Sequence, residues 1–139
     1  MIVVLDVKFI IAFLSKKDEN HPEIADYVRE LKQENPTIMF VVTNFILSET
    51  LTRLEHTLKI SKKIVIDILE SIESDPSIKV ETIDEPTFRR SLHFYRNYLD
   101  KHWSMVDFTT YTYMKENNLD IIATVGHKDA IQFGFRVIP

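Results

Sequence analysis

Two kinds of apolar run alternate along the chain, and their alternation predicts an α/β fold. Short continuous runs, typical of buried strands, occur at "MIVVL", "TIMFVV", "SIKVETI", "LDIIAT" and "FRVI". Between them, apolar residues recur every three or four positions, as on one face of a helix. This order predicts a three-layer α/β/α sandwich with a mainly parallel central sheet.

Helical periodicity covers residues 8–16, 21–35, 44–58, 61–74, 84–102 and 104–118, with a short turn or helix at "HKDAIQF". Two of these stretches predict core-facing stripes, namely Leu47, Leu51, Leu54 and Leu58 in one and Ile64, Ile68 and Ile72 in the other. His102 and Trp103, just before the last long helix, are expected nearer the surface.

The composition fits a single domain over residues 1–139. The chain has no cysteine, which excludes disulfides and zinc–thiolate sites and suits a reducing cytoplasm. No apolar run approaches the roughly 20 residues that span a bilayer, and the start of the chain lacks signal-peptide features. We therefore expect a cytoplasmic protein without a membrane partner.

The formal net charge is −4. Proteins that bind nucleic acid by bulk charge are usually basic. An RNA-binding role therefore requires a local basic patch, a metal ion or a partner.

Three carboxylates stand at expected strand ends or on the helices that are entered from them. Asp6 follows the first strand, Glu49 lies nearly two turns inside the helix after the second strand, and Asp107 lies in the first turn of a late helix. Open parallel sheets bind ligands at the carboxyl ends of their strands, so these side chains could share one cavity. Oxygen-only ligands favour Mg²⁺ or Mn²⁺, ions that bind and polarise phosphates and activate water.

Each carboxylate also has a purely structural explanation. Asp6 fits the N-cap of the first helix, and Asp107 stands three residues after Ser104, as in a capping box. Glu49 precedes Arg53 by four residues, the spacing of an ordinary surface ion pair. Their order and context together favour a metal site.

The order of these segments resembles the PIN-domain family, and within it the small VapC-type toxin ribonucleases. The resemblance spans nearly the whole chain and rests on "VVLDVKFIIAFL", "ENHPEIADYV", "VVTNFILSETLTRL", "HWSMVDFTTYTYMKENNLDIIAT" and "FGFRVIP". It implies a PIN-like α/β/α fold, bound Mg²⁺ or Mn²⁺, hydrolysis of RNA phosphodiester bonds, and catalytic and metal-binding roles for Asp6, Glu49 and Asp107. For the toxin branch it also implies a homodimer and a cognate antitoxin protein that blocks the site.

The sequence departs from the family pattern at two places. Small or hydroxyl residues usually follow the first Asp, whereas Val7 and Lys8 follow here; Lys8 either acts as a local cation or points to solvent. Many members carry a fourth acid just after the fourth strand, where this chain has Gly126 or His127. Asp129 is a further candidate metal ligand if its loop bends inward, and otherwise caps or solubilises a short helix.

The candidate nucleic-acid contacts are Thr43, Asn44, Arg53 and Lys128. Thr43 and Asn44 stand at a helix start, where backbone N–H groups can hold a phosphate, although capping alone explains Thr43. Arg53 and Lys128 either contact phosphates or belong to solvated surfaces. His127 is a further candidate ligand or phosphate contact.

Three other functions stay open on the sequence alone. A catalytically weakened PIN-like domain would bind RNA or a protein without metal and without cleavage. A phosphatase or receiver-like domain would need a nucleophilic Asp, an acidic partner and a well-placed Lys, which the sequence does not show convincingly. A plain scaffold would use all three acids structurally.

Overall fold

The computed structural model describes residues 1–126 and 128–139, so the candidate His127 lies outside the described residues. The described strands are β1 (Ile2–Leu5), β2 (Met39–Thr43), β3 (Ile78–Glu81), β4 (Ile121–Ala123) and β5 (Arg136–Ile138). They form one sheet in the order β3-β2-β1-β4-β5, and every neighbouring pair is parallel.

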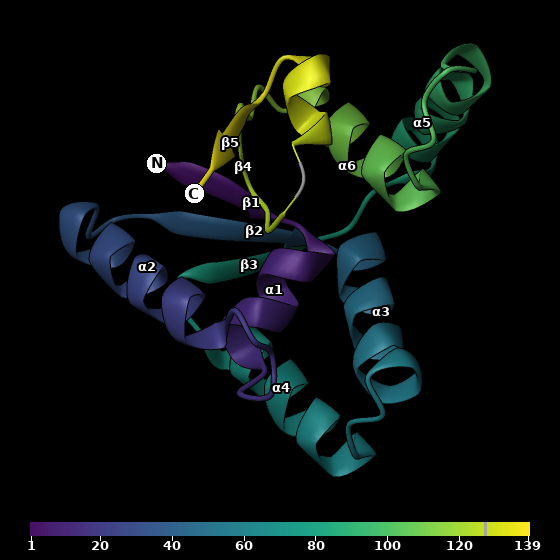
Figure 1. Cartoon of the computed structure of the whole chain (residues 1–139). Coiled ribbons are helices and arrows are strands. Elements are labelled where there is room, and N and C mark those ends of the chain that lie inside the picture. Colours follow the sequence, from purple (N-terminus) through teal and green to yellow (C-terminus); the bar gives the residue numbers. More distant parts are fainter. Residues whose placement is uncertain (127) are drawn as a thin grey trace.

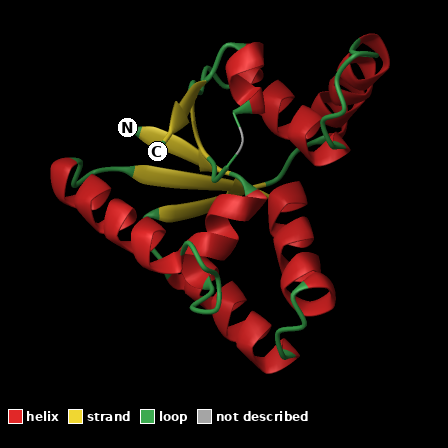
Figure 2. Cartoon of the chain, viewed as in Figure 1, coloured by secondary structure: helices red, strands yellow, loops and turns green. Residues whose placement is uncertain are grey.

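The longer helices are α1 (Val7–Leu14), α2 (His21–Glu34), α3 (Asn44–Thr52), α4 (Lys62–Ser74), α5 (Glu85–Asn97) and α6 (Met105–Glu116). A π-helical turn, η1 (Arg53–Thr57), extends α3, and a 3₁₀ helix, η2 (Asp129–Phe133), precedes β5. Figure 2 shows these helices arranged around the layer of strands. The expected α/β sandwich with a mainly parallel sheet is confirmed.

The central strand β1 lies between β2 and β4, with Val4 in register with Val41 on one side and Ile122 on the other. Val3 and Val4 are fully buried, because helices cover both faces of the sheet at this position. In Figure 1, the carboxyl ends of β1 and β2 point to a region with α3 on one side and α5 and α6 on the other. This arrangement brings the starts of α1, α3 and α6 to the same end of the sheet.

Two residues of the expected core stripes lie at the surface. Leu54 is buried as expected, but Leu58 is 48% exposed. The backbone N–H of Leu58 donates to the carbonyl of Arg53 five residues earlier, and this wide turn shifts the helical phase. In α4, Ile64 is 43% exposed and Val65 takes its place in the core. Within the described part of the chain, no helix combines the length and apolar character needed to cross a bilayer.

The expectation that Trp103 lies near the surface is wrong. Its side chain is 8% exposed, and its ring lies 5.5 Å from that of Phe108 and 5.6 Å from that of Phe133. An aromatic cluster fills the space between α5, α6 and η2; it consists of Phe94, Tyr98, Trp103, Phe108, Tyr111, Phe133 and Phe135. His102 is exposed, as expected.

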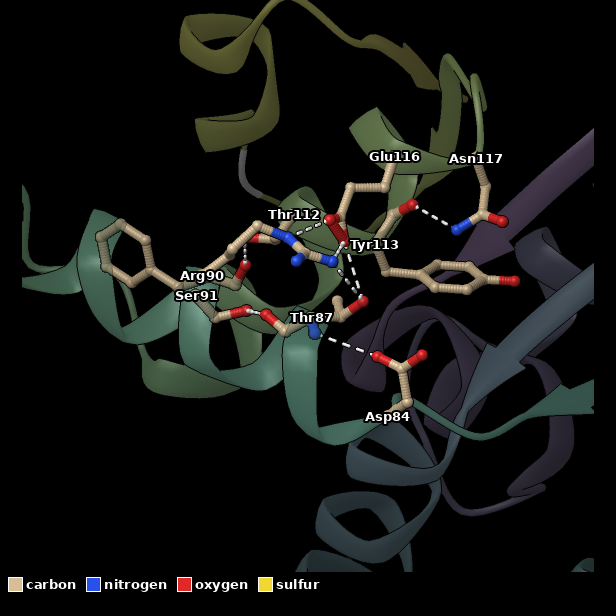
Figure 3. A network of polar contacts seen from close by, with 9 residues as sticks. Asp84, Thr87, Arg90, Ser91, Thr112, Tyr113, Glu116 and Asn117 are labelled. Carbon is tan, nitrogen blue, oxygen red and sulfur yellow. Dashed lines mark hydrogen bonds and ion pairs between the residues drawn. The ribbon is translucent and has the colours of Figure 1, made fainter.

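A polar network also joins α5 to α6 (Figure 3). Asp84 caps α5 by accepting a hydrogen bond from the Thr87 backbone N–H. The Thr87 hydroxyl donates to Glu116 at 2.8 Å, and the Arg90 guanidinium donates to the same carboxylate at 2.9 Å. These contacts hold the end of α6 against the start of α5, opposite the end of α6 that carries Asp107.

We expect Glu116→Gln to lower the free energy of unfolding at neutral pH. In acid, the difference in this free energy between the variant and the wild type should disappear. The hydrogen bond from Arg90 lowers the pKa of Glu116. A carboxyl group with a lowered folded-state pKa stabilises the protein above its unfolded-state pKa, and this contribution disappears as the pH falls through the folded-state value. Urea titrations of both proteins at neutral pH and at about pH 3 measure the difference. An equal difference at both pH values would contradict the prediction.

Candidate active site

A pocket of about 470 Å³ adjoins the carboxyl end of β1. Four carboxylates line it, each from a different element: Asp6 directly after β1, Glu49 in α3, Asp107 in α6 and Asp129 in η2. We call this cavity the central pocket. The three acids expected to converge, and the tentative fourth, therefore lie around one cavity.

Asp6 is both the N-cap of α1 and part of the pocket wall. Its Oδ1 accepts a hydrogen bond from the Phe9 backbone N–H at 2.8 Å, and its own N–H donates to the carbonyl of Ala123 in β4. The side chain is only 7% exposed. The capping explanation is correct, and it fixes the carboxylate at the strand end rather than excluding a role in the pocket.

Asp107 is held in the same way at the start of α6. The Ser104 hydroxyl accepts from the Asp107 N–H at 3.1 Å, and the Asp107 carboxylate accepts from the Ser104 N–H at 3.1 Å. This is the expected capping box. Ser104 also lines the central pocket, so the capping box itself forms part of the wall.

Glu49 has no such structural explanation. The ion pair expected between Glu49 and Arg53 is not among the ion pairs between described residues. Both side chains are half-buried and line the central pocket. Asp129, in the first turn of η2, is also half-buried and lines the central pocket.

Burial and three of the pocket carboxylates raise the pKa of one side chain, that of Tyr111. Tyr111 lines the pocket and is 1% exposed. Burial raises the pKa of its hydroxyl, and the negative charges of Asp107, Asp129 and Asp6 raise it further. The hydroxyl therefore stays protonated at neutral pH and is a hydrogen-bond donor, not a base.

The donor chemistry of the pocket suits Mg²⁺ or Mn²⁺, because carboxylate oxygens are the ligands that hard divalent ions prefer. Such an ion would also offset the mutual repulsion of the four carboxylates. Among the described residues, however, no three Asp, Glu or His side chains are already grouped so that they could hold a metal ion.

Of the residues expected to contact nucleic acid, some line the central pocket and others do not. Arg53 lines the central pocket, and so does Lys8. Thr43 is fully buried and accepts a hydrogen bond from the Ile46 N–H, so it has no surface with which to contact RNA. Asn44 accepts a hydrogen bond from the N–H of Ile83 and lies outside the pocket wall.

Lys128 is exposed and lines a different cavity, with Thr124 and Gly126. Tyr111, which the sequence places near Asp107 either as a base-stacking side chain or as a core residue, is buried and also lines the central pocket. Thr110 lines the pocket as well but was not identified from the sequence. It follows Asp107 by three positions, so helical spacing places it on the same face of α6 and could have revealed it.

The sequence profile of the PIN domain matches residues 3–131. The chain therefore belongs to the PIN domain family. A search of curated protein sequences found no significant match.

Solved structures share the fold over nearly the whole chain. Mycobacterium tuberculosis VapC20, a toxin that cleaves the sarcin-ricin loop, is 18% identical with a TM-score of 0.76, covering 98% of this chain and 97% of that chain. VapBC2 from Rickettsia felis, bound to a DNA fragment from its promoter, is 13% identical with a TM-score of 0.72, covering 99% and 98%. FitAcB from Neisseria gonorrhoeae is 18% identical with a TM-score of 0.65, covering 100% and 97%. At these identities the likeness concerns the fold.

Proposed function

We propose that this protein is a divalent-metal-dependent endoribonuclease that hydrolyses RNA phosphodiester bonds. The observation that carries the proposal is the convergence of Asp6, Glu49, Asp107 and Asp129 on one pocket at the carboxyl end of β1. A pocket of this charge suits a divalent cation and, through it, an anionic substrate. Membership of the PIN domain family and the fold shared with the VapC20 toxin support this activity.

In this proposal, Asp6, Glu49, Asp107 and Asp129 hold Mg²⁺ or Mn²⁺. When bound there, the ion would supply Lewis-acid chemistry for phosphodiester hydrolysis. Lys8 and Arg53, on the same wall, offset the negative charge of the incoming phosphate. The products carry a 5′-phosphate and a 3′-hydroxyl.

We also propose that the protein is the toxin of a toxin–antitoxin pair, acts as a homodimer and is blocked by an antitoxin protein. The support comes from the similar structures, which include the VapC20 toxin and the VapBC2 and FitAcB assemblies. Co-expression with the product of a neighbouring gene, scored by growth, tests the toxin role.

A second candidate function is a metal-independent RNA- or protein-binding module. The observation that favours it is that Asp6 and Asp107 both accept helix-capping hydrogen bonds, which account for these two side chains without a metal ion. The two functions differ in their response to chelation.

We expect EDTA to abolish RNA cleavage and excess Mn²⁺ or Mg²⁺ to restore it, because the four carboxylates repel one another and cannot bind phosphate without a cation. Cleavage of a labelled RNA on a denaturing gel measures this effect. Circular dichroism in EDTA is the control for folding. Cleavage that continues in EDTA would contradict the metal-dependent mechanism, and RNA binding without any cleavage would favour the binding module.

A further inference from the structure

A second cavity of about 340 Å³ adjoins the central pocket and shares two side chains with it, Lys8 and Arg53. Ile11, Leu58 and Val125 contribute apolar surface to its wall. We call it the side pocket. Its volume lies near the lower end of the range for small-ligand sites, roughly 300–1,000 Å³, so it is suited to one nucleotide rather than a duplex.

The lining is mainly acidic in the central pocket and mainly basic in the side pocket, and the two cations lie on the wall that the pockets share. The central pocket carries four carboxylates, whereas Asp18 is the one carboxylate among the residues that line the side pocket. Neither Lys8 nor Arg53 forms an ion pair with another described residue. Two cations are therefore available between the pockets to contact a backbone phosphate.

The apolar side of the side pocket includes Leu58, which the wide turn of η1 leaves 48% exposed. Ile11 lies on the other helix of this wall and is 6% exposed. A base lying on such surfaces removes apolar area from water, and the contact tolerates any base. A nucleotide has an anionic phosphate and a flat base with apolar faces. Cations beside an apolar surface therefore match both of its parts.

We propose that the side pocket binds the nucleotide next to the scissile phosphate of single-stranded RNA. Lys8 and Arg53 contact the backbone phosphate between the two pockets, and Leu58 supports the base. The assignment rests on the proposed function, because it assumes that the scissile phosphate occupies the central pocket. It gives a role to Lys8, which lies on the wall that the two pockets share.

The test is the binding of a short fluorescent single-stranded RNA with hydrolysis-resistant phosphorothioate linkages, followed by anisotropy at a constant concentration of Mg²⁺. We expect Lys8→Gln and Arg53→Gln each to weaken binding by about threefold to tenfold. Each should also reduce the slope of log affinity against log salt by about 0.7, the value for one lost phosphate contact on a single strand. Lys63→Gln, an exposed lysine outside both pockets, is the matched control and should change neither quantity.

Leu58→Asn tests the base contact. It should weaken binding of the RNA but not of an abasic strand of equal length, whose backbone carries the same charge. Wild-type binding by both Lys8→Gln and Arg53→Gln would overturn the proposal, even if the wild-type protein cleaves RNA. Equal losses with Lys63→Gln would also overturn it, because bulk charge would then explain them. If the expected losses occur but no metal ion supports cleavage, the side pocket is an RNA-binding site, and the nuclease function and the position next to a scissile phosphate are both contradicted.

Discussion

Asp107→Asn is expected to reduce RNA cleavage by at least about 100-fold while the protein stays folded. The substitution removes one of four negative charges from the central pocket, and transition-state stabilisation through a bound cation amounts to several kcal/mol. The Asn side chain can still accept the hydrogen bond from the Ser104 N–H, so the start of α6 should be preserved. Single-turnover cleavage rates and calorimetric titration with Mn²⁺ measure the two losses.

Asp84→Asn is the matched control for this prediction. Asp84 is also an Asp at a helix start and accepts a hydrogen bond from the Thr87 N–H, but it does not line the central pocket. Its substitution should leave cleavage and metal binding unchanged. Wild-type cleavage by Asp107→Asn would reduce Asp107 to a helix cap and contradict the proposed site.

Trp103→Ala is expected to lower the free energy of unfolding by about 3–5 kcal/mol, the usual cost of removing a large buried aromatic side chain. The indole contacts the rings of Tyr98, Phe108, Tyr111 and Phe133, so its removal leaves a cavity between α6 and η2. Urea unfolding followed by circular dichroism measures the change.

Leu99→Ala provides the control, because Leu99 belongs to the same connection between α5 and α6 but is 86% exposed. It should change stability by no more than about 0.5 kcal/mol. A loss below about 1 kcal/mol for Trp103→Ala would mean that the aromatic cluster does not hold α6 in place.

The fold could be predicted from the sequence because each strand of a sheet buried on both faces must be apolar nearly throughout. "IVVL" and "FVV" are short, continuous and rich in β-branched residues, which is typical of buried strands. The helical runs between such strands indicate parallel crossover connections. Asp6 and Asp107 could be predicted for the same reason. Asp6 is the N-cap of α1, and Asp107 forms a capping box with Ser104, so both lie at helix starts. In this topology, helix starts gather at the carboxyl ends of the strands.

Other features depend on geometry that local patterns do not encode. No residue in the sequence marks the wide turn that exposes Leu58. Likewise, the spacing of apolar residues in α4 is compatible with either Ile64 or Val65 on the buried face. Thr43 shows a related limit. A helix start after a strand can hold a phosphate, but here the side chain is fully buried as a cap. Its exposure depends on the packing of the neighbouring strands.

The four carboxylates of the central pocket come from positions 6, 49, 107 and 129, which span almost the whole sequence. During synthesis on the ribosome, a nascent chain has Asp6 and Glu49 long before the segment that brings Asp129 to them. The pocket is complete only after η2 has been made, and β5, which pairs with β4 beside it, follows η2 in the chain. A chain that ends before η2 therefore lacks one of the four carboxylates of the proposed site.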